Sequence, residues 1–363
     1  MTLLSSPMTF RGGRSAPNRI WVAPMTNGSS HRDGRLSDDE YGFLTARAAG
    51  GFAVVETCAT HVHLDGQGWE GELGIFDDRH IEGWRRLADG VHEHGALLFG
   101  QAFHGGRRAL RGGGRPAPWS CSATDSDPAL VAADESRIER VISDFAHAAR
   151  RLERAGADGV ELHGAHDYLL CQFLRADFNR RDDAWGGDLA GRARLIRHVM
   201  RAVRAAVSER FIVGARLSPE SYGRTTGLDL DESVEVASWL CEDGADFIHL
   251  SLWDASKNTQ KRPDVHAAQV FRDALPAEIP VITAGNMWTL DDARAQLDLG
   301  ADAVALGRAA IANPDWPRAV VSGGLQPKRP PLGRGELRER ALGPAFVDYM
   351  TKWPGFVKDE PPA

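Results

Sequence analysis

SRIERVISDFAHAARRLERAGADGVELH, residues 136–163, joins a clear helix pattern to a clear strand pattern through one short turn. Apolar residues spaced three and four apart predict an amphipathic helix over Ser136–Ala155, with a stripe of Ile138, Val141, Ile142, Phe145, Ala149 and Leu152. Gly156 follows, and a glycine at this place can adopt the left-handed conformation that ends a helix. The apolar run Gly159–His163 then predicts a short buried strand. The stretch is therefore one helix–turn–strand unit of an α/β protein.

The same unit recurs along the chain. Short apolar runs bounded by Gly, Pro or polar residues predict eight strands: Ile20–Ala23, Ala53–Thr57, Leu97–Gln101, Gly159–His163, Phe211–Leu217, Phe247–Ser251, Val281–Ala284 and Ala303–Leu306. Helical spacing of apolar residues also marks Arg192–Val207, Leu230–Cys241 and Leu290–Leu299. Five helix ends carry a glycine shortly before the next strand, at Gly50-Gly51, Gly95, Gly156, Gly244 and Gly300.

Eight strands that alternate with helices can form a doubly wound sheet or a closed barrel. The count of eight favours a (β/α)8 TIM barrel, and no G-x-G-x-x-G follows the first strand, which weakens the dinucleotide-binding alternative. We expect residues 1–363 to form a single domain with long βα loops, His61–Asp78 and Gly105–Ser136, and a C-terminal tail over about 317–363. The aromatic stretch Phe346–Val357 is expected to pack on the barrel or on a neighbouring subunit of a homo-oligomer.

The composition excludes several classes of protein. The net charge is −7 and no basic cluster is present, which argues against a nucleic-acid partner. Four cysteines lie far apart without a C-x-x-C pair, which argues against a local metal site and a disulfide framework. No apolar run reaches the length of a signal peptide or a membrane span, so we expect a cytoplasmic protein without membrane contact.

The last two predicted strands lead into a candidate phosphate site. In barrels the loops after strands seven and eight commonly bind phosphate, and here they carry Gly285, Asn286, Gly307 and Arg308. Glycine allows the backbone to approach an anion closely, and arginine adds charge-assisted hydrogen bonds. The alternative is that the two glycines only make tight turns.

The fourth predicted strand ends in a candidate catalytic group. His163 and His166 lie three positions apart, so a helical turn would point both to one side, and Tyr168 follows closely. Two imidazoles can polarise one oxygen atom, and a phenol can deliver a proton. A metal pair and two structural histidines are the alternatives, the first without an obvious third ligand.

Gln101 and Arg216 end the third and fifth predicted strands. An arginine facing the inside of a barrel is costly unless it meets an anion or an electron-rich ligand. With the donor and acceptor of a neighbouring glutamine, the pair suits a planar heterocycle with amide-like edges.

These residues, together with HGAHDYLLCQFL (163–174) and NRRDDAWGG (179–187), resemble the Old Yellow Enzymes, which are FMN-dependent ene-reductases. The resemblance extends from Asn18 to about Trp316 and includes the barrel fold. It implies that three groups of residues hold FMN. The pyrimidine edge is held by Gln101 and Arg216, and the redox-active side is lined by Pro24, Met25, Thr26 and Ala59. The phosphate is held by Gly285, Asn286, Gly307 and Arg308.

The resemblance also implies the reaction. NADH or NADPH would supply hydride, and the substrate would be a small molecule with an activated C=C bond, an α,β-unsaturated carbonyl or nitro compound. His163 and His166 would bind its oxygen, Tyr168 would donate the proton, and Phe103 would steer the substrate. The remaining alternatives are a flavin-dependent dehydrogenase or amine demethylase, and a flavin-free barrel isomerase or lyase that binds phosphate.

Overall fold

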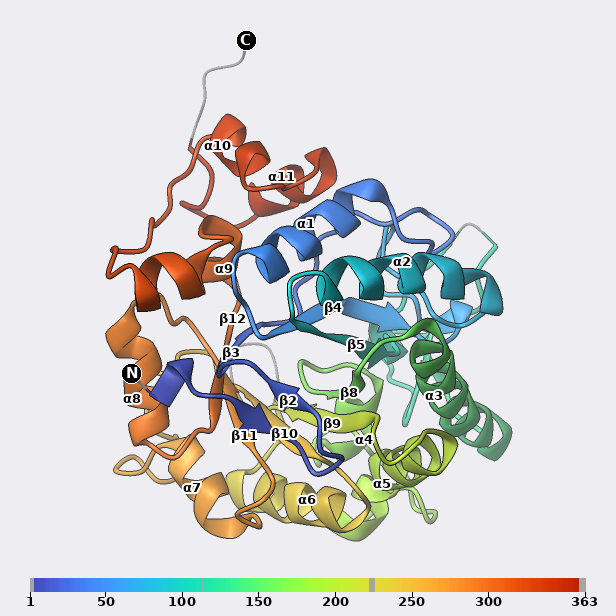
Figure 1. Ribbon diagram of the computed structural model, residues 1–363. Helices are drawn as coiled ribbons and strands as arrows, with labels where there is room; N and C mark the ends of the chain where they lie inside the picture. The colour runs from blue at the N-terminus through green and yellow to red at the C-terminus, as the bar shows by residue number, and fades with distance from the viewer. Residues whose placement is uncertain (1–2, 113, 222–225, 359–363) are drawn as a thin grey trace.

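Eight parallel strands close into a barrel in chain order, which confirms the predicted (β/α)8 fold (Figure 1). The computed structural model describes residues 3–112, 114–221 and 226–358. The strands are β3 Ile20–Val22, β4 Val54–His61, β5 Leu97–Phe103, β8 Gly159–Gly164, β9 Ile212–Leu217, β10 Phe247–Ser251, β11 Val281–Ala284 and β12 Ala303–Leu306. Strands β4 and β5 run past their predicted ends, because an irregularity between Glu56 and Ala59 lets the two strands stay paired as far as His61 and Phe103.

Helices surround the barrel and connect its strands (Figure 1). They are α1 Asp38–Ala49, α2 Ile81–His92, α3 Glu135–Ala155, α4 Leu169–Leu174, α5 Leu189–Ala206, α6 Leu230–Glu242, α7 Ala267–Ala274, α8 Leu290–Asp298 and α9 Arg308–Ala312. The predicted helix ends are confirmed, since the five junction glycines, Gly51, Gly95, Gly156, Gly244 and Gly300, have φ between +73° and +108°.

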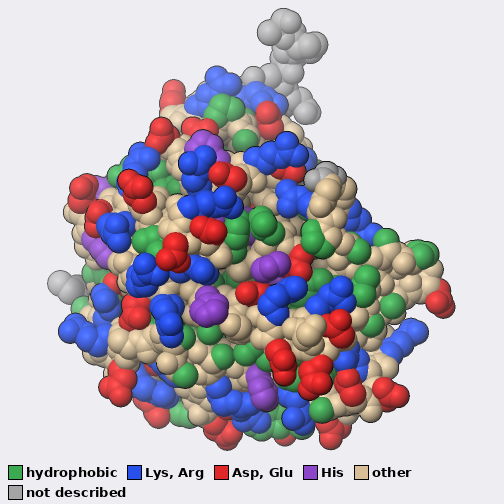
Figure 2. All heavy atoms as spheres, turned by 90° about the vertical axis from the view of Figure 1, so that its right-hand side faces the viewer, with side chains coloured by type: hydrophobic (Ala, Val, Ile, Leu, Met, Phe, Trp, Pro, Cys, Tyr) green, Lys and Arg blue, Asp and Glu red, His purple; other side chains and the backbone are tan. Residues whose placement is uncertain are grey.

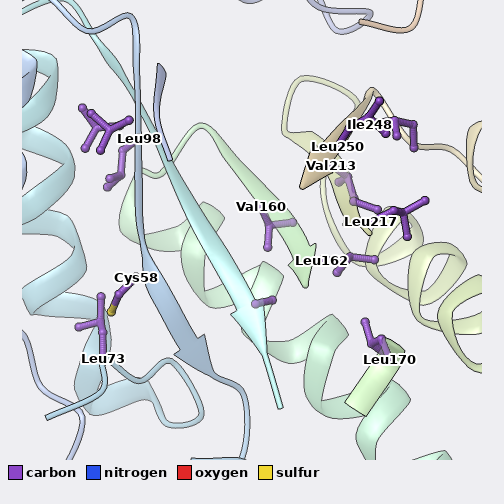
Figure 3. Close-up of a cluster of buried hydrophobic side chains, with 14 of the residues drawn as sticks. Cys58, Leu73, Leu98, Val160, Leu162, Leu170, Val213, Leu217, Ile248 and Leu250 are labelled. Atoms are coloured by element: carbon purple, nitrogen blue, oxygen red, sulfur yellow. The ribbon is translucent and has the colours of Figure 1, made fainter. Parts of the chain in front are cut away.

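The main hydrophobic core lies between the barrel and the helices. Alternate strand residues belong to it together with helix residues such as Ile138 and Val141; Figure 3 labels Leu98, Val160, Leu162, Val213, Leu217, Ile248 and Leu250 among them. The intervening residues of the same strands therefore face the inside of the barrel.

Aromatic rings close the amino-terminal end of the barrel. The ring of Trp21 lies 5.5 Å from that of Phe99 and 5.3 Å from that of Phe247. Phe10 packs on them, 5.9 Å from Phe99, from the turn between β1 (Met8–Thr9) and β2 (Ser15–Ala16). This aromatic floor leaves the opposite end, where the strands finish, as the open one.

Two long loops lie above the ends of β4 and β5, and Asp65 ties them together. Its carboxylate accepts hydrogen bonds from His104 Nε2 (2.9 Å), Trp119 Nε1 (3.1 Å) and Arg140 Nη2 (2.5 Å). Burial would raise the pKa of Asp65, but His104 and His63, the latter at 2.7 Å, hold it far below its ordinary value.

The C-terminal tail packs on the barrel beside α1 (Figure 1). Helices α10 (Arg334–Glu339) and α11 (Pro344–Met350) follow β12, and the ring of Phe346 lies 5.0 Å from that of Phe43 in α1. The buried Arg47 donates from Nη1 to the carbonyl of Arg340 over 2.8 Å. Of the two places predicted for the aromatic stretch, the tail thus occupies the barrel surface.

Basic and acidic side chains are interspersed over the face that Figure 2 presents. Within the described residues, no helix combines the length and the hydrophobicity needed to cross a bilayer.

Candidate active site

A cavity of about 520 Å³ opens where the barrel strands end. Thirteen of the fourteen residues predicted for the site line it: Pro24, Met25, Thr26, Ala59, Gln101, His163, His166, Tyr168, Arg216, Gly285, Asn286, Gly307 and Arg308. Residues that are far apart in the chain meet here because all eight strands point the same way.

Phe103 is the exception, because the structure does not bring it to the cavity wall with the other predicted residues. Its side chain is fully buried and does not line the cavity. The loop after β4 covers it, because a Cβ at Gly68 would lie only 3.1 Å from the Phe103 ring. The neighbouring Trp69, whose ring centroid is 5.6 Å from that of Phe103, forms the cavity wall instead.

The two histidines and the tyrosine form one cluster. The ring of His163 lies 5.0 Å from the rings of both His166 and Tyr168. The helical turn that would place both histidines on one side does not form, since His166 and Asp167 have φ of +60° and +61° and α4 begins only at Leu169. Asp167 fixes this left-handed turn, because its carboxylate accepts from Arg107 Nη2 and Arg175 Nη1, both over 2.5 Å.

Burial makes both histidines neutral hydrogen-bonding groups. It lowers the pKa of His163 and of His166 well below the ordinary value, and the nearby charge of Arg216 adds to the effect. The backbone N–H of Ala165 donates to Nδ1 of His163 over 3.3 Å, so neutral His163 carries its proton on Nε2. Nε2 of His166 lies 2.5 Å from the hydroxyl of Ser251.

Tyr168 remains a proton donor at neutral pH. Burial raises the pKa of its phenol above the ordinary value. The guanidinium of Arg108 lies over the ring, 4.6 Å from its centroid, and donates to the carbonyl of His166 over 2.7 Å. Arg108 thus holds a positive charge beside the group that would become negative on losing its proton.

Gln101 and Arg216 both line the cavity, and each leaves a hydrogen-bonding atom without a protein partner. Nε2 of Gln101 donates to Glu161 over 2.7 Å, so its carbonyl oxygen is left to accept. Arg216 donates from Nη2 to Ser251 over 3.1 Å, while its buried Nε has no partner. A buried guanidinium N–H without a partner is costly, and an amide-like edge of a planar ligand would satisfy it.

Of the two glycines predicted to bind phosphate, one faces the cavity freely and the other is needed for packing between loops. A Cβ at Gly307 would make only an ordinary contact, 3.5 Å from Met25 Sδ, and the residue faces the cavity. A Cβ at Gly285 would lie 2.6 Å from the carbonyl of Leu252, so this glycine is needed for packing between loops. Asn286 accepts from Arg308 Nη2 over 2.7 Å, which orients the arginine at the rim.

Sequence reasoning missed several wall residues. Ser251 ends the sixth predicted strand, and the strand-end rule that found Arg216 also applies to it. Tyr349, Met350 and Trp353 come from the tail, whose aromatics were noted without a position. No sequence pattern singled out Trp69, because its place depends on how the long loop folds back.

The residues described contain one group of three potential metal ligands, Glu56, Glu161 and His249, beneath the cavity. His163 and His166 do not belong to it.

The comparisons with known proteins agree with this geometry. Residues 4–326 match the model of the NADH:flavin oxidoreductase / NADH oxidase family. The probable NADH-dependent flavin oxidoreductase YqiG of Bacillus subtilis is 32% identical over 332 residues, which are 88% of either chain. The NADH:fumarate oxidoreductase of Klebsiella pneumoniae is 32% identical over 334 residues, 87% of this chain but only 36% of that longer protein.

Among solved structures, the old yellow enzyme homologue from Zymomonas mobilis superimposes with a TM-score of 0.80 at 28% identity, over 96% of this chain and 99% of that one. The match thus includes the strands that carry the cavity and most of the chain around it. By fold and by sequence, the chain belongs to the NADH:flavin oxidoreductase / NADH oxidase family, the FMN-dependent oxidoreductases that include the Old Yellow Enzymes.

Proposed function

We propose that the protein reduces activated C=C bonds of α,β-unsaturated carbonyl or nitro compounds at the expense of NADH or NADPH. One observation carries the proposal: two histidines and a tyrosine meet in one cavity with the polar pair Gln101 and Arg216. FMN, when bound, supplies the redox chemistry by accepting hydride from the nicotinamide and passing hydride to the alkene. The name of the Klebsiella relative supports the substrate class, since fumarate is an activated alkene.

The residues hold the cofactor by its two polar ends. Gln101 and Arg216 bind the pyrimidine edge with the acceptor and donor that their protein contacts leave unused. Pro24, Met25, Thr26 and Ala59 line the redox-active side, and Gly285, Asn286, Gly307 and Arg308 bind the phosphate. At this second end Gly307 faces the cavity and Arg308 brings the charge, while Gly285 keeps the loop close.

The residues of the turn after β8 act on the substrate. His163 and His166 bind its carbonyl or nitro oxygen and stabilise the negative charge that develops there as hydride reaches the β-carbon. Tyr168 then gives its proton to the α-carbon, and solvent restores the phenol. The product has gained one hydride and one proton, and the C=C bond has become a single bond.

Two measurements test the proposal. The purified protein is expected to release FMN on acid precipitation, and to oxidise NADH or NADPH when 2-cyclohexenone is added, with cyclohexanone as the product. A colourless protein that fails to bind added FMN contradicts the cofactor assignment. A yellow protein that reduces no enone, and instead oxidises an amine or a hydroxyl compound, contradicts the direction of the reaction.

We also propose a cytoplasmic location. Cys58, Cys121, Cys171 and Cys241 are all free and buried, which suits a reducing compartment.

A further inference from the structure

A buried polar layer lies between the aromatic floor of the barrel and the cavity. It consists of Glu56 on β4, Glu161 on β8 and His249 on β10, each at most 1% exposed. Oε2 of Glu161 lies 2.6 Å from Nδ1 of His249, and Oε2 of Glu56 lies 3.8 Å from the same atom. Burying three ionisable groups inside a barrel core costs free energy of folding, which suggests that the groups have a function.

The polar layer contacts the residues assigned to the cofactor. Gln101 is the register partner of Glu161 and donates its amide N–H to that carboxylate over 2.7 Å. Arg216 is the register partner of His249, and its charge interacts with both Glu161 and Glu56. The layer therefore touches both groups that face the pyrimidine edge.

The polar layer holds one negative charge. Burial raises the pKa of Glu56 well above its ordinary value, and the neighbouring charge of Glu161 raises it further. The pKa of Glu161 is lowered despite burial, because His249, Arg216 and Gln101 stabilise its carboxylate. Burial also lowers the pKa of His249, which as a neutral ring donates Nδ1–H to Glu161. These shifts favour the negative charge on Glu161 rather than on Glu56.

A bound metal ion would suit the same three ligand types, but the surroundings disfavour it. The guanidinium of Arg216 already supplies a positive charge to both carboxyl groups. A divalent cation there would add two more positive charges in a closed core.

We propose that Glu161 is a positioning residue for FMN. His249 holds the Glu161 carboxylate, which in turn fixes the Gln101 amide with the amide oxygen toward the cavity. The negative charge of Glu161 also offsets part of the positive charge of Arg216. Glu161 thereby sets both the affinity of the site for FMN and the relative affinities for its oxidised and reduced forms. This inference rests on the proposed binding of the pyrimidine edge by Gln101 and Arg216.

The matched pair Glu161→Gln and Glu56→Gln tests it, with the dissociation constant of FMN and its midpoint potential as readouts. Glu161→Gln removes the charge and leaves Arg216 uncompensated, which favours the more negative reduced flavin. We expect the affinity ratio of reduced to oxidised FMN to rise about tenfold or more, a potential about 30 mV more positive for a two-electron couple. Glu56→Gln keeps the shape of a carboxyl group whose pKa is raised, and it is expected to change the ratio by less than about twofold.

A third variant covers the case in which Glu161→Gln does not fold. Glu161→Asp keeps the charge but shortens the reach to Gln101, so we expect weaker FMN binding with an unchanged potential. Equal shifts for the two glutamine variants, or an unchanged affinity and potential in Glu161→Gln, overturn the inference. One equivalent of a tightly held metal in the purified wild-type protein also overturns it. If wild-type protein binds no FMN, the proposed function fails instead, so the two failures are distinguishable.

Discussion

At the scale of single residues, the role of Tyr168 can be distinguished from that of the histidines, because Tyr168 acts only when the reduced flavin is reoxidised by the substrate. We expect Tyr168→Phe to leave flavin reduction by NADH or NADPH close to wild type, because that half needs no proton from the phenol. Reoxidation by an enone is expected to slow about a hundredfold, the usual scale for general acid catalysis. Stopped-flow absorbance of the flavin measures both halves.

A nitroalkene provides the control for this variant. Its reduction is expected to slow less, because the nitro group stabilises the anion left by hydride transfer until solvent protonates it. Equal slowing of both half-reactions, or of neither, contradicts the role given to Tyr168.

The histidine pair has a different signature. Alanine at His163 or His166 is expected to weaken phenol binding and to slow enone reduction by about a hundredfold to a thousandfold, as when one oxyanion donor is removed. If enone reduction stays at the wild-type rate in the double variant, the two histidines are structural. Spectral titration with a phenol and steady-state rates measure these effects.

Both histidines also make the stability of the fold depend on pH. Their pKa values are lowered in the folded protein, so the unfolded chain binds protons first as the pH falls through about 6.5. The free energy of unfolding is therefore expected to decrease below that pH, and the two alanine variants are expected to lose part of this dependence. Denaturant unfolding at pH 5.5 and 7.5 compares them, and an unchanged dependence in both variants contradicts the assigned protonation.

The residues of the site were predictable where strand ends determine their position. His163, Gln101 and Arg216 each occupy an inward position at the end of a buried run, so the barrel rule brought them together from sequence alone. Phe103 has the same inward spacing, but the loop containing Gly68 and Trp69 covers it. That loop is fixed by distant partners of Asp65, which no local pattern reveals.

At the scale of elements, the strands and helices followed from periodicity, but the turn after β8 did not. His166 and Asp167 adopt left-handed φ because two arginines hold the Asp167 carboxylate, Arg107 from the loop after β5 and Arg175 from just beyond α4. Sequence spacing cannot show such long-range ion pairs, and from spacing alone a helical turn was the condition for both histidines to share a side. The turn still presents both histidines to the cavity, by a different route.

This turn depends on Asp167. Asp167→Ala removes the acceptor of two arginines, one of them buried, and is expected to lower the free energy of unfolding by about 3 kcal/mol. Asp167→Gly removes the same contacts but tolerates the left-handed φ, so it is expected to be about 1 kcal/mol less harmful. Both are expected to reduce enone turnover, since Tyr168 follows directly. Urea unfolding measures the two changes.

The exposed pair Arg294–Asp291 offers a matched control. Asp291→Ala is expected to leave both stability and turnover nearly unchanged, because exposed ion pairs contribute little. Equal stability of Asp167→Ala and Asp291→Ala contradicts the anchoring role.

At the scale of the whole molecule, the barrel and the C-terminal tail build the cavity together. The tail reaches the site through Tyr349, Met350 and Trp353, and it is held down by Phe346 against Phe43 of α1. Helices α1 and α11, which are far apart in the sequence, thus lie side by side on the barrel (Figure 1). The sequence showed that the tail contains aromatic residues. The position of the tail could not be predicted, because it packs on a surface of α1 that forms only in the folded barrel.

Two substitutions distinguish the contribution of the tail to stability from its contribution to ligand binding. Phe346→Ala empties a fully buried site and is expected to lower the free energy of unfolding by about 3 to 5 kcal/mol. Trp353→Ala acts at the rim, where the residue is 41% exposed and its ring centroid lies 5.9 Å from the guanidinium of Arg308. This variant is expected to leave the thermal midpoint within about 2 °C of wild type, because the loss of the ring removes at most about 1 kcal/mol of cation–π attraction.

Trp353→Ala is expected to affect ligand binding instead. We expect a severalfold rise in KM for bulky enones and little change for cyclohexenone, which is too small to reach the rim. Thermal unfolding and steady-state kinetics on both variants measure the separation. A Trp353→Ala protein that loses stability as Phe346→Ala does, with no preference between large and small enones, would show that the tail only supports the barrel.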